Sequence, residues 1–320
     1  MNAAVVSAFG APPRYASFPD PVAGQGEKLV TVTAAGLHPI VKALASGTHY
    51  GSTGELPLVP GVDGVGRLQD GSRVYFNSAR PPFGTFAERS LASDRMCLLL
   101  PDGIDDVTAA GIANPGMSSW VALSARAKFV AGESLLILGA TGVAGQMAVK
   151  IAKRRGARRV VAVGRNPQAL EKLKELGADA VISLDQENNA VVSAFRRELA
   201  ESGVDIVLDY LWGSPAEAMI AAIAQKGLQK AAPRIRYVQI GESAGKTIAL
   251  PGSTLRSSGL EILGSGFGSA SLDQMRQALI ELFNAAAQTP FKFSTKAVPL
   301  RDVEAAWNSP EHGVRLVFQP

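Results

Sequence analysis

The feature that most constrains this chain is a glycine-rich turn between an apolar run and a helical run. The apolar run Leu135-Leu-Ile-Leu138 leads into Gly139-Ala-Thr-Gly-Val-Ala-Gly145, and Gln146 to Lys153 follows with helical spacing. A strand that turns through glycines directly into a helix opens a βαβ unit. The residues that follow should therefore continue to alternate between strands and helices.

The expected alternation runs to about residue 264. We predict strands at Ser134 to Ala140, Arg158 to Val163, Ala180 to Leu184, Val204 to Tyr210, Ile235 to Gly241 and Leu260 to Gly264. Helical periodicity lies between them, at Val143 to Arg155, Pro167 to Leu176, Asn188 to Ser202 and Pro215 to Lys226. Such a pattern predicts an α/β fold, a Rossmann-type doubly wound parallel sheet.

The glycine turn itself matches the dinucleotide fingerprint, with Ala140 where the first glycine usually stands. Gly142 lets the backbone approach a pyrophosphate, and Gly145 lets the helix pack closely on the strand. Free N–H groups beside Thr141 and Val143 would face the anion. The alternative, a glycine turn that binds nothing, is disfavoured by its place after the first of six expected strands.

The end of the second expected strand reads Gly164-Arg165-Asn166 and bears on the choice between NAD and NADP. Gly164 lies 22 residues after Gly142, where an acidic residue would accept the ribose 2′-hydroxyl of NAD. Without that carboxylate, Arg165 can pair with a 2′-phosphate, and we place Asn166 beside it. The cofactor predicted is NADPH. Arg165 as a solvated turn residue is the plain alternative.

Composition excludes several classes of protein. Net charge is only +4 and the basic residues are scattered, so nucleic acid is not expected as a partner. A single cysteine, Cys97, permits no intrachain disulfide and suits a reducing compartment. Neither a leader nor a long uncharged apolar stretch is evident, so no membrane partner is expected. The sequence predicts a cytoplasmic protein.

The first 118 residues have a different texture from the alternating part. Short β-type runs broken by glycine and proline lie at Lys28 to Thr33, Gly64 to Leu68, Ser72 to Phe76 and Phe86 to Leu91. A long helix from Leu272 to Gln288 and a β-like run from Val314 to Phe318 end the chain. We expect a mostly-β domain at 1–118, completed by 267–320, with the dinucleotide-binding domain at 119–266.

Several segments resemble the medium-chain dehydrogenases and reductases, in the branch of quinone oxidoreductases and zeta-crystallin. They are Ala34-Ala-Gly-Leu-His-Pro39, Pro60-Gly-Val-Asp-Gly-Val-Gly66, Gly84-Thr-Phe-Ala-Glu88, Leu100-Pro-Asp-Gly103, Ala113-Asn-Pro-Gly-Met-Ser-Ser-Trp120 and the glycine turn. The resemblance spans nearly the whole chain. It implies that the mostly-β domain is GroES-like and catalytic.

The resemblance also implies where zinc ligands would stand, and this chain lacks them. Leu37 occupies the place of a catalytic cysteine, and Pro60-Gly-Val-Asp63 replaces a Gly-His-Glu segment. One cysteine cannot form a four-cysteine cluster, and the three histidines have no recognisable zinc spacing. We therefore expect no metal and a zinc-independent reaction.

Hydride transfer without a metal suits an acceptor that is itself electron-poor, such as a quinone or an α,β-unsaturated carbonyl. His38 and Tyr50 are the catalytic candidates, with His49 nearby. The family that the chain resembles usually has asparagine, and a nearby aspartate, where this chain has His38 and Val41, so the resemblance implies an altered polar network here. His38 as a structural histidine and Tyr50 as a packing residue remain open alternatives.

Further cofactor-binding candidates follow from the resemblance and from strand ends. They are Asn114, Tyr210, Ile240, Gly241 and Phe267. Two other functions stay open, a non-catalytic NADPH-binding protein and an enoyl-thioester reductase; RNA binding lacks any aromatic-and-basic motif. The last strand, 260–264, should be an edge through which a homodimer forms.

Overall fold

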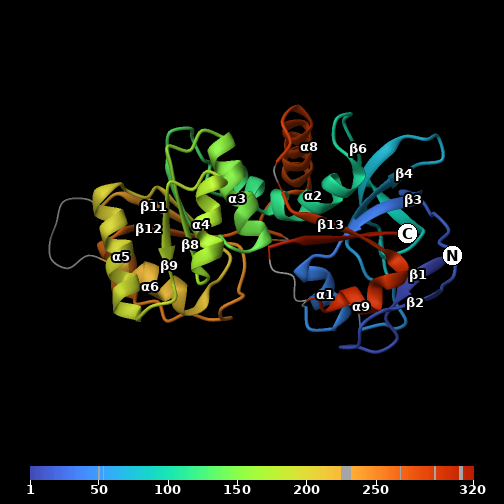
Figure 1. Cartoon of the computed structure of the whole chain (residues 1–320), viewed down its shortest axis with the longest axis horizontal. Coiled ribbons are helices and arrows are strands. Elements are labelled where there is room, and N and C mark those ends of the chain that lie inside the picture. Colours follow the sequence, from blue (N-terminus) through green and yellow to red (C-terminus); the bar gives the residue numbers. More distant parts are fainter. Residues whose placement is uncertain (50, 53, 225–231, 267, 292, 310–312) are drawn as a thin grey trace. The chain divides into compact units, whose positions relative to one another are not determined.

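The chain folds into two compact units. The structure, a computed structural model, describes residues 1–320 except 50, 53, 225–231, 267, 292 and 310–312 (Figure 1). One unit comprises Met1–Asn114 and Ile280–Pro320, and the other Pro115–Leu279. The domain limits expected from the sequence, 118/119 and 266/267, stay a prediction.

A six-stranded parallel sheet, ordered β9–β8–β7–β10–β11–β12, forms the centre of the second unit. Its strands are β7 (Ser134–Leu138), β8 (Arg159–Gly164), β9 (Ala180–Ser183), β10 (Ile206–Asp209), β11 (Arg234–Gln239) and β12 (Gly259–Gly264). All six predicted strands are present. The strand order reverses between β7 and β10, where doubly wound sheets bind ligands at the carboxyl ends of their strands. The predicted Rossmann-type fold is confirmed.

Helices cover both faces of this sheet, because its strands are apolar on both sides. They are α3 (Val143–Arg154), α4 (Pro167–Glu175), α5 (Asn188–Glu201), α6 (Gly213–Ile223) and α7 (Gly252–Ser257). Phe195 of α5 and Met219 of α6 pack with Leu136, Val207 and Tyr237 in one core cluster. Helix α6 begins two residues before its predicted start, and its predicted end at Lys226 lies outside the described residues.

The first unit is built on an antiparallel barrel. Strand β3 pairs with both β4 and β6, so β3–β4–β5–β6 closes on itself, and β14 and β13 extend the sheet from β3. The elements are β1 (Asn2–Val5), β2 (Arg14–Ser17), β3 (Glu27–Gly36), α1 (Pro39–Ala45), β4 (Asp63–Arg67), β5 (Arg73–Ser78), β6 (Arg89–Leu99), β13 (Thr295–Pro299), α9 (Val303–Trp307) and β14 (Arg315–Gln319). The final predicted strand therefore does return to this unit.

Two predictions for the first 118 residues were wrong in detail. The run predicted as a strand at Phe86 to Leu91 begins as a strand only at Arg89 and continues to Leu99. Phe86 and Glu88 instead exchange backbone hydrogen bonds with β1, which takes them out of β6. A helix, α2 (Asp106–Val121), was missed because Gly111, Pro115 and Gly116 are weak helix formers, and packing overrides that preference.

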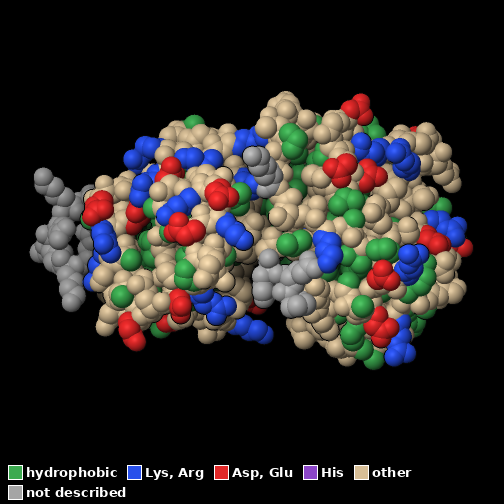
Figure 2. All heavy atoms as spheres, viewed as in Figure 1, with side chains coloured by type: hydrophobic (Ala, Val, Ile, Leu, Met, Phe, Trp, Pro, Cys, Tyr) green, Lys and Arg blue, Asp and Glu red, His purple; other side chains and the backbone are tan. Residues whose placement is uncertain are grey.

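Helix α8 (Leu272–Gln288) has its predicted limits. Two single-turn segments complete the elements, a π-helical turn at Ala122–Arg126 and a 3₁₀ turn at Leu300–Asp302. On the face shown in Figure 2, lysines and arginines alternate with aspartates and glutamates. Among the described residues, no helix combines the length and apolarity needed to cross a membrane.

Candidate functional site

The glycine loop joins β7 to α3 with the geometry of an anion site. Gly142 is the N-cap of α3 at φ −74° and ψ 163°, and no side chain caps the helix. A Cβ on Gly145 would lie 2.3 Å from the carbonyl oxygen of Gly139. Glycine at 145 is therefore required for the helix to pack against the end of the strand.

Gly142 differs from Gly145 in what its surroundings demand. A Cβ there would meet only the Gly139 carbonyl oxygen, at an ordinary 3.5 Å. Packing within the protein does not require glycine at 142. A ligand that comes close to the backbone would require it, because a Cβ would stand in its way. The N–H groups of Val143 and its two successors, in the first turn of α3, have no intrahelical acceptor and suit a phosphate.

The end of β8 lies directly against this loop. A Cβ on the buried Gly164 would lie 2.6 Å from Thr141 Cγ2, so the position accepts no larger side chain without movement. Arg165 follows and is exposed. Asn166 caps α4, its Oδ1 accepting from the Ala169 N–H at 2.9 Å. The structure thus places Gly164 against Thr141, with the exposed Arg165 next along the chain.

Three more of the predicted residues meet at the carboxyl ends of β10 and β11. The N–H groups of Ile240 and Gly241 donate to the Asp209 carbonyl at 2.7 and 3.1 Å. A Cβ on Gly241 would lie 2.7 Å from the Tyr210 carbonyl oxygen. Burial raises the pKa of the Tyr210 phenol, while the neighbouring hydroxyls of Ser119 and Ser118 lower it.

The remaining candidates are Asn114, His49, Tyr50 and Phe267. Asn114 lies half-buried within α2 and directly before Pro115, a helical position that the sequence did not predict. His49 turns back on its own loop, where its Nδ1 accepts from the Gly51 N–H at 3.0 Å. Tyr50 and Phe267 lie outside the described residues.

His38 belongs to a buried polar cluster that the sequence did not reveal. Its Nε2 lies 3.1 Å from Asp63 Oδ1, and neither residue is more than a few per cent exposed. Asp63 also accepts from the Tyr75 hydroxyl at 2.9 Å. Burial lowers the pKa of His38, an effect that Asp63 partly offsets. The imidazole is therefore neutral at neutral pH.

Arg315 completes this cluster from β14. It donates to the Leu37 carbonyl, and burial lowers the pKa of its guanidinium to about 10 while Asp63 opposes that shift. His38, Asp63, Tyr75 and Arg315 lie far apart along the chain, so no pattern in the sequence links them. His38, the N-cap of α1, is held between a carboxylate and a cation.

The donor set around His38 does not fit zinc. Among the described residues, no three histidine, cysteine, aspartate or glutamate side chains converge. Asp63 already accepts from Tyr75, and the guanidinium of Arg315 would repel a divalent ion. A histidine and one engaged carboxylate are too few ligands for a structural or catalytic zinc site.

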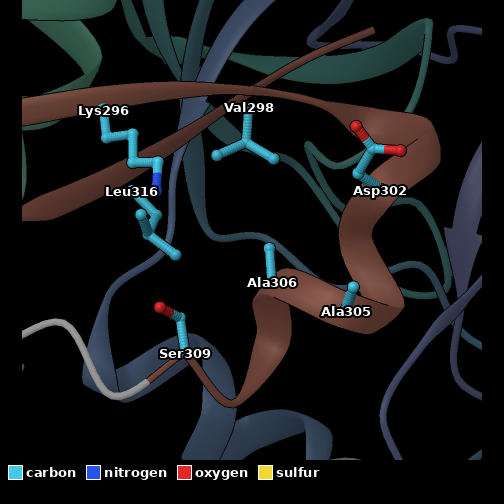
Figure 3. Close-up of a pocket in the computed structure, with 7 residues that line it drawn as sticks. All are labelled: Lys296, Val298, Asp302, Ala305, Ala306, Ser309 and Leu316. Atoms are coloured by element: carbon cyan, nitrogen blue, oxygen red, sulfur yellow. The ribbon is translucent and has the colours of Figure 1, made fainter.

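A separate pocket of about 300 Å³ lies in the first unit, between β13, β14 and α9. In Figure 3 the ammonium of Lys296 lies just above the Leu316 side chain, and the hydroxyl of Ser309 lies below it. None of the predicted site residues that the structure describes lines it.

The chain is similar to known dehydrogenases and reductases. Residues 143–285, from α3 into α8, match a family model described as zinc-binding dehydrogenase. The whole chain is 27% identical to a probable NADPH-dependent quinone reductase of Emericella nidulans, over the full length of both. A quinone oxidoreductase of Lama guanicoe is 29% identical over 66% of each chain. The chain is thus similar to quinone reductases and quinone oxidoreductases of the medium-chain dehydrogenase and reductase type.

Solved structures extend the likeness to both units of the chain. The quinone oxidoreductase of Thermus thermophilus, solved alone and in complex with NADPH, has a TM-score of 0.77 and 26% identity. The alignment covers the full length of both chains. The mostly-β unit is accordingly the GroES-like domain that the resemblance implied.

Proposed function

We propose that this chain reduces a quinone or an α,β-unsaturated carbonyl with NADPH and without zinc. Its similarity to a probable NADPH-dependent quinone reductase and to a quinone oxidoreductase solved with NADPH supports an NADPH-dependent oxidoreductase. One observation carries the assignment most directly: the open first turn of α3 lies against a strand end that offers Arg165 and no carboxylate. That combination favours a dinucleotide with a 2′-phosphate.

The proposed cofactor contacts fall at two places along the carboxyl edge of the sheet. The backbone at Thr141, Gly142, Val143 and Gly145 would hold the pyrophosphate, with Gly164, Arg165 and Asn166 at the 2′-phosphate. Tyr210, Ile240 and Gly241 at β10 and β11, together with Asn114 and Phe267, are proposed for the nicotinamide half. Bound NADPH would supply a hydride to the acceptor.

The catalytic roles of His38 and Tyr50 remain proposals. His38 is fully buried here, so donation to a developing oxyanion would require its ring to reach the acceptor. His38 contacts Asp63 and is the N-cap of α1, which supports a role for His38 in positioning the segment that begins α1. We propose that hydrogen bonding and exclusion of water, rather than a Lewis acid, assist the reaction.

Oxidation of NADPH and NADH by chelator-treated protein tests this function. The acceptors would be quinones, enones and enoyl thioesters, with both cofactors titrated by fluorescence. NADPH turnover with a quinone or an enone and no zinc requirement is the expected result. Binding without turnover would favour a non-catalytic NADPH-binding protein, and turnover restricted to thioesters would favour an enoyl-thioester reductase. Loss of activity on chelation would contradict the metal-free mechanism.

Self-association and location are also proposals. Among the described residues β12 pairs with β11 on one side only, which supports a homodimer through Gly259–Gly264. Light scattering during size-exclusion chromatography would measure the molar mass in solution. Ile262→Pro is expected to shift that mass toward the monomer. A cytoplasmic location and a small-molecule acceptor as the main partner remain part of the same proposal.

A further inference from the structure

Trp212 has a backbone conformation that non-glycine residues rarely adopt. Its φ is 56° and its ψ −158°, a region populated almost only by glycine. Such a conformation costs about 1–3 kcal/mol and persists only where the surroundings impose it. Residues held in this way cluster at ligand-binding sites and clamps.

Asp209, the last residue of β10, imposes the conformation. Its Oδ1 accepts from the N–H groups of Leu211 at 2.8 Å and Trp212 at 3.0 Å. Its Oδ2 accepts from the Tyr237 hydroxyl at 2.7 Å, and the carboxylate is fully buried. The buried Asp209 side chain thus holds the turn after β10, and the Ala244 N–H donates to the Leu211 carbonyl of the same turn at 2.7 Å.

The Trp212 indole packs against Tyr237 on one side and is exposed on another. Its ring meets the ring of Tyr237 edge-on, with centroids 6.3 Å apart and planes at 66°. Trp212 remains half-exposed and lines a pocket of about 350 Å³ with Gln239, Ile262, Leu263 and Gly264. Gln239 and Gly264 are the last residues of β11 and β12, so the pocket lies at the carboxyl edge of the sheet.

The charges around this pocket indicate what kind of molecule it accepts. Glu242 and Lys246 are its charged lining residues, one of each sign. The lining thus brings no net charge that would attract the phosphates of a thioester carrier. The other lining groups are apolar side chains, one amide and an aromatic face, which suit an uncharged planar ring.

We infer that Trp212 is a specificity-determining residue that stacks on the planar ring of an uncharged acceptor. This inference rests on the proposed function. It makes quinones the preferred acceptors, ahead of acyclic enones and thioesters. The strained turn positions the indole, and Asp209 and Tyr237 keep it from rotating away. Offset stacking of two rings is favourable beyond the area that it buries.

The matched variants Trp212→Phe and Trp212→Leu test the inference, because both retain a Cβ and the backbone donors to Asp209. With an uncharged naphthoquinone, Trp212→Leu is expected to lose about three- to tenfold in kcat/KM, mainly through KM, and Trp212→Phe no more than about twofold. An acyclic enone should respond equally to both variants. The Kd for NADPH should not change. Circular dichroism and Tm would establish that both variants fold.

Equal losses for the naphthoquinone and the enone would overturn the inference. So would a weakened NADPH affinity in Trp212→Leu, which would assign the indole to the nicotinamide ring instead. Quenching of tryptophan fluorescence by the naphthoquinone, without NADPH, gives a readout independent of turnover. Wild type should be quenched more than Trp212→Phe. If wild type reduces no acceptor the proposed function fails, whereas equal quenching in the two proteins rejects the stacking.

Discussion

A Cβ atom on Gly164 would lie 2.6 Å from Thr141 Cγ2, so the end of β8 and the glycine loop meet where only a glycine fits. An acidic residue at this position, as an NAD-specific site would carry, cannot be accommodated unless Thr141 moves. The contact links cofactor preference to the packing of the loop. Both properties therefore depend on the same pair of residues.

Gly164→Ala is expected to lower the free energy of unfolding by about 1–3 kcal/mol, because the added methyl overpacks the contact with Thr141. Thr141→Ser removes Cγ2 and should restore most of that loss in the double variant. Urea denaturation of the four proteins gives the coupling energy. Additive effects of the two changes would show that the contact is not the cause.

Gly142→Ala and Gly145→Ala separate ligand binding from folding. Gly145→Ala should destabilise the protein strongly, since its Cβ would lie 2.3 Å from the Gly139 carbonyl oxygen. Gly142→Ala should keep the wild-type Tm, because its Cβ meets nothing closer than 3.5 Å, yet weaken NADPH binding. Thermal melts and NADPH titration would measure both. Unchanged NADPH affinity in Gly142→Ala would argue against a pyrophosphate at this turn.

Arg165→Ala should weaken NADPH binding about tenfold and leave NADH binding unchanged, because the exposed guanidinium would contact only the 2′-phosphate. Fluorescence titration at low and high salt would measure this, and the difference should shrink as salt screens the pair. Arg197→Ala is the matched control, since that exposed arginine lies near the carboxyl end of α5. Equal losses for both cofactors would reject a role at the 2′-phosphate.

Stability should fall as the pH drops below about 6.5, the ordinary pKa of histidine. Burial lowers the pKa of His38 in the folded protein, so below that pH the unfolded chain binds a proton that the folded chain does not. The contribution is fully present above pH 6.5 and is lost toward the lower, folded pKa. The slope is at most about 1.4 kcal/mol per pH unit.

Urea midpoints between neutral and mildly acidic pH would measure this slope. His38→Asn, which removes the buried imidazole, should flatten the profile, and His49→Asn should leave it as in wild type. A profile that is the same in His38→Asn and in wild type would place the titrating group elsewhere.

Much of the second unit was predictable from the sequence. Buried parallel strands read as apolar runs, and their crossover helices show a different period, so the six strands and four of the helices followed from local pattern. The glycine loop was found for the same reason, because its residues are contiguous. Helix α2, whose residues belong partly to each unit, escaped detection since packing stabilises a helix that contains Pro115 and two glycines.

By itself, then, the sequence determined the doubly wound sheet, the glycine loop and the missing acidic residue at Gly164, because each depends on neighbours along the chain. Only the tertiary structure decided which distant residues meet. Arg315 donates to Leu37 across 278 positions of sequence, and Asp63 and Tyr75 join His38 from two other strands. Tyr237 of β11 likewise meets Asp209 of β10 across 28 positions, and this contact orients the carboxylate that binds the Trp212 N–H. Such contacts arise from strand pairing and burial, which no local spacing encodes.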